Sequence, residues 1–376
     1  MAKIAILAGE PSGDLIASQL MAYIISKVSD IEFVGVGGPL MKQQGLRSFF
    51  DYSNLSLYGI FQVIPNIPKL IFLRHRLIKY LINEKPDIFI GVDAPDFNFY
   101  IEKKLKQSGI STFHYVAPSV WAWRPKRVYK IKKSTDHIFS IFPHEKPLFK
   151  KVGIETTFVG HPLANKIPLK SNMNKYRKML KLDRKELVIV LLPGSRMGEL
   201  KAHTDILLQT AQNLFKVYPD AKFLIPATND KNMNFIKDRI KNNPTKNLKL
   251  IKGKVDEILS SANIAIAASG TASLQIALHK KPMIIIYKGS WISYFVWKMV
   301  RLIPHVSLPN ILLNENFVPE MLQYKATSTI LSKRACVILE DKRYLKKLES
   351  KFFKLHKNLK MNTSSLIFKK IKPYLK

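Results

Sequence analysis

Two turns in the second half of the chain combine residues that favour binding of an anion. The first, the turn 193–196 (PGSR), follows the unbroken apolar run 187–192 and precedes a helix-like segment. The second, the turn 269–271 (SGT), follows the apolar run 263–268 in the same way. Backbone N–H groups at a helix start favour anions, and Arg196 adds a planar, permanently charged group suited to phosphate. Two such turns predict a site for a diphosphate.

Two carboxylates in the first half of the chain follow another apolar strand candidate. Asp93 and Asp96 come after the segment 87–92, at the edge of the sheet where α/β proteins collect their chemistry. One of them can serve as general base for a hydroxyl nucleophile. Asp96 stands next to the predicted helix start near Phe97 and suits an N-cap. Asp93 is therefore the better catalytic candidate.

The first strand-to-helix turn, 8–14 (AGEPSGD), lacks the G-x-G-x-x-G pattern, which argues against a nicotinamide cofactor. It is either a structural turn with Asp14 as a helix cap or a functional loop in which Glu10 acts.

Trp121 and Trp123 stand beside Arg124 and could stack on a sugar or a base. A packed lid with a basic face explains these residues equally well.

The segment 60–77 (IFQVIPNIPKLIFLRHRL) has an apolar stripe at helical spacing, followed by basic residues. Pro65 and Pro68 argue against one long regular helix. An apolar surface with a basic flank is typical of an interfacial membrane anchor, and a core-facing helix is the alternative. A second segment, 291–303, has the same character. The predicted membrane-contact residues are Phe61, Val63, Ile64, Ile67, Leu70 and Ile71.

These candidates must be positioned by alternating strands and helices. Apolar runs of strand length recur between helix-like segments in both halves, which predicts an α/β protein with two parallel, doubly wound sheets. The polar stretch 161–186 is the predicted linker, and the chain after Pro319 is expected to be helical. A ligand is expected in the cleft between the two halves, at the carboxyl ends of strands.

Composition narrows the class of protein further. The chain has 376 residues, 47% of them hydrophobic, which is enough for two cored domains. A single cysteine, Cys336, argues against disulfides or a cysteine metal site. The nine histidines show no metal-ligand spacing, and His161 is expected to be structural. Neither a signal peptide nor a spanning helix is expected. The net charge of +34 would attract an anionic membrane or nucleic acid, but the charge is spread along the chain.

Seven motifs occur in a specific order: AGEPSGD, GVDAPDFN, YVAPSVWAW, GHP, LLPGSR, SGTASL and VSLPNIL. Together, from Ala8 to about Gln323, they closely resemble the lipid-A-disaccharide synthases, which are inverting glycosyltransferases of the GT-B fold. Enzymes of this family join UDP-2,3-diacylglucosamine to 2,3-diacylglucosamine 1-phosphate (lipid X). They release UDP and a β-1,6-linked disaccharide 1-phosphate without a metal ion. The resemblance implies the same activity here, in lipopolysaccharide biosynthesis, with no cofactor.

The resemblance also implies a role for each matching residue. Asp93 would be the general base, and Glu10 and Ser12 would lie in the acceptor-side catalytic loop. At one matching position the family usually has an acid and this chain has Gln275, which offers one acceptor oxygen and one donor group. The implied UDP-binding residues are Gly194, Ser195, Arg196, Ser269, Gly270, Thr271, Gln275, Asn310 and Gln323.

The implied architecture is two Rossmann-like doubly wound domains facing each other across a cleft. Residues 1–165 would form the acceptor and membrane-contact domain, and residues 166–342 the UDP-sugar donor domain. C-terminal helices, about 343–376, would pack back on the first domain, and a homodimer that exchanges this segment is an open alternative. The implied location is cytoplasmic, peripheral on the inner face of the inner membrane, with no specific nucleic acid as partner.

Two other function classes remain open from the residues. One is another GT-B UDP-sugar glycosyltransferase or a UDP-sugar epimerase. The apolar segment 60–71 argues against this class, because it indicates that the substrate is not purely soluble. The other is a non-catalytic basic protein that binds membranes or nucleic acid. It accounts for the charge, but it leaves Asp93 and the two phosphate turns without a purpose.

Overall fold

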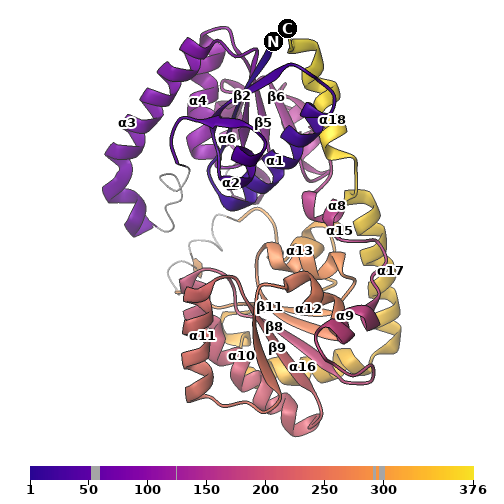
Figure 1. The fold of residues 1–376 in the computed structure, drawn as a ribbon. Helices are drawn as coiled ribbons and strands as arrows, with labels where there is room; N and C mark the ends of the chain where they lie inside the picture. The colour runs from indigo at the N-terminus through magenta and orange to yellow at the C-terminus, as the bar shows by residue number, and fades with distance from the viewer. Residues whose placement is uncertain (52–59, 124, 291–293, 296–300) are drawn as a thin grey trace. The chain divides into compact units, whose positions relative to one another are not determined.

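The chain folds into two compact units, which Figure 1 shows as a ribbon. Unit 1 comprises Met1–Pro162 and Leu359–Lys376, and unit 2 comprises Leu163–Asn358. The computed structural model describes residues 1–51, 60–123, 125–290, 294–295 and 301–376, and of residues 60–67, 69 and 123 it describes the backbone only.

Unit 1 is built on a parallel sheet in the order β3-β2-β1-β4-β5-β6-β7. Its strands are β1 (Ala2–Ala8), β2 (Ile31–Val36), β3 (Leu46–Ser48), β4 (Ile88–Val92), β5 (Ser111–Tyr115), β6 (His137–Ser140) and β7 (Glu155–Phe158). The helices are α1 (Pro11–Ile25), α2 (Pro39–Gln43), α3 (Ile60–Glu84), α4 (Pro95–Gln107), α5 (Val120–Trp123), α6 (Arg127–Lys132), α7 (Glu145–Lys150) and α18 (Thr363–Ile371). Such a sheet is covered on both faces, so its central strands are almost wholly apolar and buried.

Unit 2 repeats this topology with the order β10-β9-β8-β11-β12-β13. Its strands are β8 (Val188–Leu192), β9 (Lys222–Ala227), β10 (Leu248–Lys252), β11 (Ile264–Ala268), β12 (Met283–Tyr287) and β13 (Glu320–Leu322). Its helices are α9 (Met173–Met179), α10 (Met197–Val217), α11 (Asp230–Asn242), α12 (Val255–Ser261), α13 (Thr271–Leu278), α15 (Leu308–Leu313), α16 (Ser328–Glu340) and α17 (Lys342–Leu359); α8 (Pro162–Lys166) lies at the boundary between the units.

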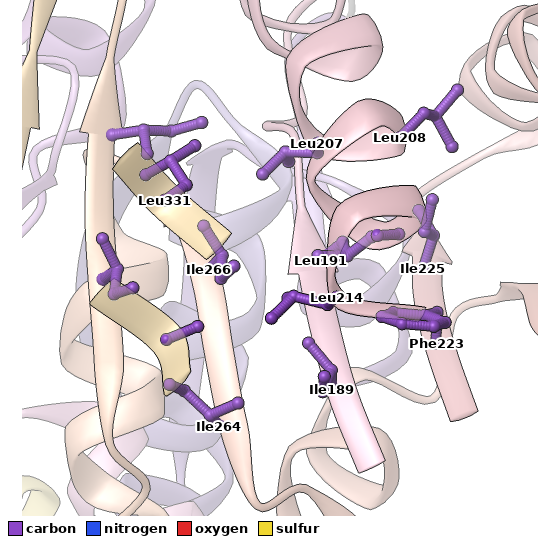
Figure 2. Packing of buried hydrophobic residues seen from close by; sticks show 14 of the residues in the cluster. Ile189, Leu191, Leu207, Leu208, Leu214, Phe223, Ile225, Ile264, Ile266 and Leu331 are labelled. Atoms are coloured by element: carbon purple, nitrogen blue, oxygen red, sulfur yellow. The ribbon is translucent and has the colours of Figure 1, made fainter. Parts of the chain in front are cut away.

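One hydrophobic cluster shows how the apolar runs hold unit 2 together. Leu207 and Leu214 of α10 pack over Ile189 and Leu191 of β8 and over Ile266 of β11 (Figure 2). Leu331 of α16 joins the same cluster, so the chain after β13 contributes to this core. The burial of these side chains fixes the two strands whose ends carry the predicted anion-binding turns.

Three expectations about the elements were wrong. The predicted linker contains α9, whose buried Arg177 donates to the carbonyl of Ser261 and to the side chain of Asn263. Helix α3 continues through Pro65 and Pro68, each of which removes only one backbone hydrogen bond from a 25-residue helix. The chain after Pro319 begins with a strand, β13, because these residues pair with β12.

The C-terminal segment returns to unit 1 later in the chain than the predicted residue 343. Helix α17 belongs to unit 2 almost to its end, and the return begins at Leu359. Helix α18 then lies beside α1 (Figure 1), with the Phe368 and Tyr23 rings 6.0 Å apart. The Thr363 hydroxyl donates to the carbonyl of Val159 at 2.8 Å.

Candidate functional site

The predicted site residues follow the strands at which each sheet reverses its direction of winding. In unit 1 the strand order changes between β1 and β4, and Ala8 pairs with Val92. In unit 2 it changes between β8 and β11, and Leu192 pairs with Ala267. Ligands of doubly wound proteins bind beyond the carboxyl ends of strands at such switch points. Within each unit, the two predicted loops are therefore neighbours.

Asp93 lies directly at the end of β4 in an unusual backbone conformation. Asp93 and Ala94 both have positive φ, 52° and 42°, which is rare for non-glycine residues and is found at functional sites. The Asp93 N–H donates to the carbonyl of Tyr115 at 2.9 Å, and the Asn98 amide donates to the carbonyl of Asp93 at 2.7 Å. Its half-buried carboxylate has no hydrogen-bond partner within the part of the chain that the structure describes. It is available as a proton acceptor.

Asp96 does not cap helix α4, contrary to the sequence-based prediction. Ala94 is the N-cap residue and makes no side-chain cap bond. The Asp96 carboxylate, 86% exposed, pairs with Arg127 instead. With Pro95 at the first helical position, Asp96 lies in the first turn, where its charge is still favourable.

Beneath the Asp93 turn lies a fully buried pair of ionisable residues. The Glu102 Oε1 and His114 Nδ1 atoms are 2.7 Å apart. Burial raises the pKa of Glu102. A Cβ on Gly91 would collide with Glu102, so the end of β4 needs a glycine to pass over this pair. The pair packs against the backbone that leads to Asp93.

The loop after β1 is held by Asp14. The Asp14 carboxylate is buried and accepts from the N–H groups of Gly38, Leu40 and Met41 at 2.9, 3.1 and 3.0 Å. It therefore caps α2, whereas the sequence predicts a cap on its own helix, α1; that prediction was wrong. Glu10 is the half-buried N-cap residue of α1, without a side-chain cap bond, and Ser12 is exposed.

The aromatic segment after β5 is tied to a buried acid. The Trp121 indole N–H donates to Glu145 Oε1 at 3.2 Å, and burial raises the pKa of Glu145 to about 8. The other two residues of the predicted stacking group are not fully described: the side chain of Trp123 and the whole of Arg124 lie outside the described residues. His161 is buried, which lowers its pKa to about 4, so it is neutral near pH 7.

The turn 193–196 differs from the predicted anion site because a carboxylate of the chain itself occupies it. Glu199 Oε2 accepts from the N–H groups of Ser195 and Arg196 at 2.9 and 3.2 Å. Both residues are exposed at the surface. The Arg196 guanidinium is thus the group of this turn that best suits a phosphate.

The second predicted turn leaves its helix end uncapped. Helix α13 begins after Gly270, which has φ 149° and no side chain to act as a cap, and no described residue is recorded as capping its first N–H groups. The Ser269 hydroxyl donates to the carbonyl of Val306, and the Ser273 hydroxyl to the carbonyl of Gly270. Thr271 is exposed. Of the two predicted turns, this one retains the anion-binding property of a helix start.

Asn310 is fully buried and its amide is saturated inside unit 2. It donates to Val318 O and Glu320 Oε1, both at 2.9 Å, and accepts from Phe317 N and Val318 N. Glu320 also accepts from Ser307, so these residues fasten the loop before α15 to β13. In this structure Asn310 supports that loop from within.

Gln275 contacts a carboxylate that sequence inspection missed. Its Nε2 atom donates to Asp256 Oδ1 at 2.6 Å. Asp256 also pairs with His279 and Lys166, and these contacts, His279 first, lower the Asp256 pKa. A carboxylate from a neighbouring helix, α12, thus lies next to position 275.

Gln323 has the property expected of a ligand-binding amide. It is 4% exposed with φ 52°, and its Oε1 atom accepts from the N–H of Gly289. Its Nε2 atom is buried and has no hydrogen-bond partner among the residues that the structure describes. A buried unpaired donor is costly, so this amide lacks an acceptor within the described part of unit 2.

The predicted membrane-contact segment is only partly described. The side chains of Phe61, Val63, Ile64 and Ile67 lie outside the described residues, as does most of the segment 291–303. Leu70 is half-buried, Ile71 is 42% exposed and the neighbouring Phe72 is 59% exposed. Among the described helices, none is long and apolar enough to cross a membrane. The described residues also contain no cluster of three or more potential metal ligands.

Comparisons with known proteins show the family and the fold of the chain. The family model for lipid-A-disaccharide synthetase matches residues 4–371. The lipid-A-disaccharide synthase of Chromobacterium violaceum is 41% identical over 365 residues, or 96% of this chain and 95% of that one. UDP-GlcNAc 2-epimerase from Neisseria meningitidis, solved with UDP-GlcNAc, matches with a TM-score of 0.64 at 13% identity, covering 99% and 100% of the chains. The calicheamicin glycosyltransferase CalG4 matches with a TM-score of 0.59 at 10% identity, covering 100% and 98%.

The two parallel doubly wound sheets, shared with these structures, define a protein of the GT-B fold. The near full-length sequence matches go further, because they distinguish among the functions that this fold carries. The chain belongs to the lipid-A-disaccharide synthase family and is a glycosyltransferase of lipid A biosynthesis. The alternatives of an epimerase and of a non-catalytic basic protein are not retained.

Proposed function

We propose that the chain transfers 2,3-diacylglucosamine from UDP to the 6-hydroxyl of lipid X. The observation that carries this proposal is the family match over residues 4–371. The proposed products are the β-1,6-linked disaccharide 1-phosphate and UDP, with inversion at the anomeric carbon and without a metal ion.

Asp93 is the proposed general base of unit 1. It takes the proton of the 6-hydroxyl while that oxygen forms a bond to the anomeric carbon of the donor. The bond from this carbon to the diphosphate breaks, and its electron pair leaves with UDP. Support comes from the unpartnered carboxylate and the left-handed backbone at the end of β4. Glu10, the N-cap residue of α1, and Ser12, in the first turn of that helix, are proposed to contact the acceptor.

Unit 2 is proposed to bind UDP. The uncapped start of α13, at Gly270 and Thr271, and the Arg196 guanidinium would stabilise the negative charge that grows on the departing diphosphate. Gln323 has a buried unpaired donor for the nucleotide, and Gln275 with Asp256 offers acceptors for hydroxyl groups. Gly194, Ser195, Ser269 and Asn310 are proposed to shape the same site through their backbones and internal bonds.

The decisive assay mixes purified protein with UDP-2,3-diacylglucosamine and lipid X in detergent and measures disaccharide and UDP. Release of neither product would refute the proposed function. Asp93→Asn should abolish turnover while UDP binding, measured by calorimetry, stays within about twofold, because the base would act only in the chemical step. Near-normal turnover of Asp93→Asn would show that this carboxylate is not the base.

We also propose that α3 contacts the inner face of the inner membrane, since acylated substrates reside in lipid. Ile71 and Phe72 are exposed apolar side chains on α3, close to Arg74 and Arg76. Ile71→Ser with Phe72→Ser should reduce sedimentation with anionic vesicles. Ile25→Ser, at the end of α1 and equally exposed at 42%, is the matched control. Equal losses for both variants would contradict the assignment of this surface.

A further inference from the structure

Four polar backbone groups of the turn 193–196 are engaged by side chains of unit 2. The carbonyl of Pro193 accepts from His203 Nδ1 at 3.1 Å, and the carbonyl of Ser195 accepts from Asn232 Nδ2 at 2.8 Å. The N–H groups of Ser195 and Arg196 both donate to Glu199 Oε2. Since proline has no N–H, two of the three N–H groups in this turn face a carboxylate of the chain itself.

The glycine of this turn is explained by the same carboxylate. Gly194 has φ +117°, and a Cβ there would collide with the Cβ and Oε2 atoms of Glu199. In a phosphate-binding loop the missing Cβ makes room for the ligand. Here the space next to Gly194 is filled by the Glu199 side chain, so this glycine indicates close packing within the loop.

His203 fixes the turn from the opposite side. Its Nδ1 atom must carry the proton, because its partner is the carbonyl of Pro193. Its Nε2 atom then accepts from the N–H of Lys288, at 3.0 Å, just beyond β12. Burial lowers the pKa of His203, which keeps the ring neutral and preserves this arrangement of donor and acceptor.

Asn232 adds a third attachment, from α11. Its buried amide donates both to the carbonyl of Ser195 and, at 2.6 Å, to the hydroxyl of Thr228. Side chains from two helices thus hold three consecutive peptide groups of the turn, and the exposed side chain of Arg196 projects from this anchored backbone. Because the backbone of the turn is already ordered, less conformational entropy is lost when the guanidinium binds an anion.

We propose that this turn is a rigid support for Arg196 and not a backbone cradle for phosphate, and that Glu199, His203 and Asn232 are its positioning residues. The diphosphate then meets the guanidinium of Arg196, while backbone N–H groups reach it only from the start of α13. This inference rests on the proposed function, because it assumes that unit 2 binds UDP.

The test is the sign of the change in UDP affinity when Glu199 is altered. If Glu199 positions Arg196, Glu199→Ala weakens UDP binding roughly tenfold in calorimetry, because two charge-assisted hydrogen bonds that order the turn are lost. Glu199→Gln, which keeps an acceptor oxygen, binds within about twofold of the parent. If Glu199 instead competes with phosphate for the N–H groups, both variants bind UDP more tightly, and the inference is overturned.

A double-mutant cycle separates positioning from general loss of structure. Since Glu199 acts through Arg196, adding Glu199→Ala to Arg196→Ala should change UDP affinity no further; additive losses would overturn the inference. Asp341→Ala is the matched control, since Asp341 accepts from the N–H of Tyr344 at the start of α17 in the same manner. A parent protein that binds no UDP would overturn the proposed function and this inference with it. Tighter binding by the Glu199 variants would overturn the inference alone.

Discussion

The buried carboxylate of Asp14 allows a stability prediction that can be worked out bond by bond. Asp14 Oδ1 accepts from the N–H groups of Gly38 and Met41, both buried residues, and Oδ2 accepts from that of Leu40, which is exposed. In Asp14→Ala water can replace the bond at Leu40, but the other two donors stay buried without an acceptor. At about 1–3 kcal/mol for each unpaired buried donor, the loss is about 2–6 kcal/mol.

Asp14→Asn provides a graded comparison. Its amide oxygen can take the place of Oδ1 and keep both buried donors paired, while its NH₂ group faces the N–H of Leu40. The expected loss is therefore about 1 kcal/mol, that of one partly exposed hydrogen bond. Asp30→Ala, which removes an exposed acid paired with the chain's N-terminus, is the control and should change nothing at this loop.

Amide hydrogen exchange of the segment 38–41, followed by mass spectrometry, measures these differences where they arise. Exchange should accelerate about fivefold in Asp14→Asn and thirtyfold or more in Asp14→Ala, as these free energies require. Urea unfolding of the whole chain checks that the change is confined to unit 1. Equal exchange rates in the two Asp14 variants would refute the bond-by-bond reasoning, and unchanged rates in both would refute the cap itself.

Three further predictions concern the candidate site. Arg196→Ala should lower kcat about a hundredfold as well as weaken UDP binding, because the guanidinium is proposed to stabilise the leaving group. If steady-state kinetics show only a rise in KM, Arg196 binds the phosphate but does not assist bond breaking. The pKa of Glu145 is raised from 4.5 to about 8, so the folded chain holds a proton that the unfolded chain releases. The free energy of unfolding should therefore fall by about 1 kcal/mol per pH unit between these values. Urea unfolding of Glu145→Gln should lack this slope, and parallel pH profiles would contradict it. Gln275→Glu should weaken UDP binding in calorimetry by placing two carboxylates together, and Asp256→Asn in the same chain should restore it; tighter binding by Gln275→Glu alone would contradict this pairing.

The sequence predicts the strands that carry the site because they are buried on both faces and therefore almost purely apolar. β8 and β11 are such runs, and the turns that follow them were located correctly for the same reason. β3 and β13 escape prediction, since each has three residues of mixed polarity and depends on pairing with β2 or β12.

The side chains that form hydrogen bonds with the site residues are harder to predict, because most of them come from other helices. Glu199 carries a sequence signal, as an acid three residues after a helix N-cap is typical of a capping box. His203, Asn232 and Asp256 carry none, since only the fold brings them to Pro193, Ser195 and Gln275. Asn310 has a recognisable motif, yet its burial follows from the loop that it fastens.

The return of the chain to unit 1 at Leu359 has a consequence for biosynthesis. The two points at which the chain changes units are joined by a hydrogen bond from the N–H of His161 to the carbonyl of Leu359 at 2.9 Å. During translation, residues 1–162 leave the ribosome long before residues 359–376. The contact between α1 and α18 can therefore form only after the whole of unit 2 has been synthesised. The first unit to be synthesised is thus the last to be completed, and a nascent chain that stops short of Leu359 leaves it unfinished.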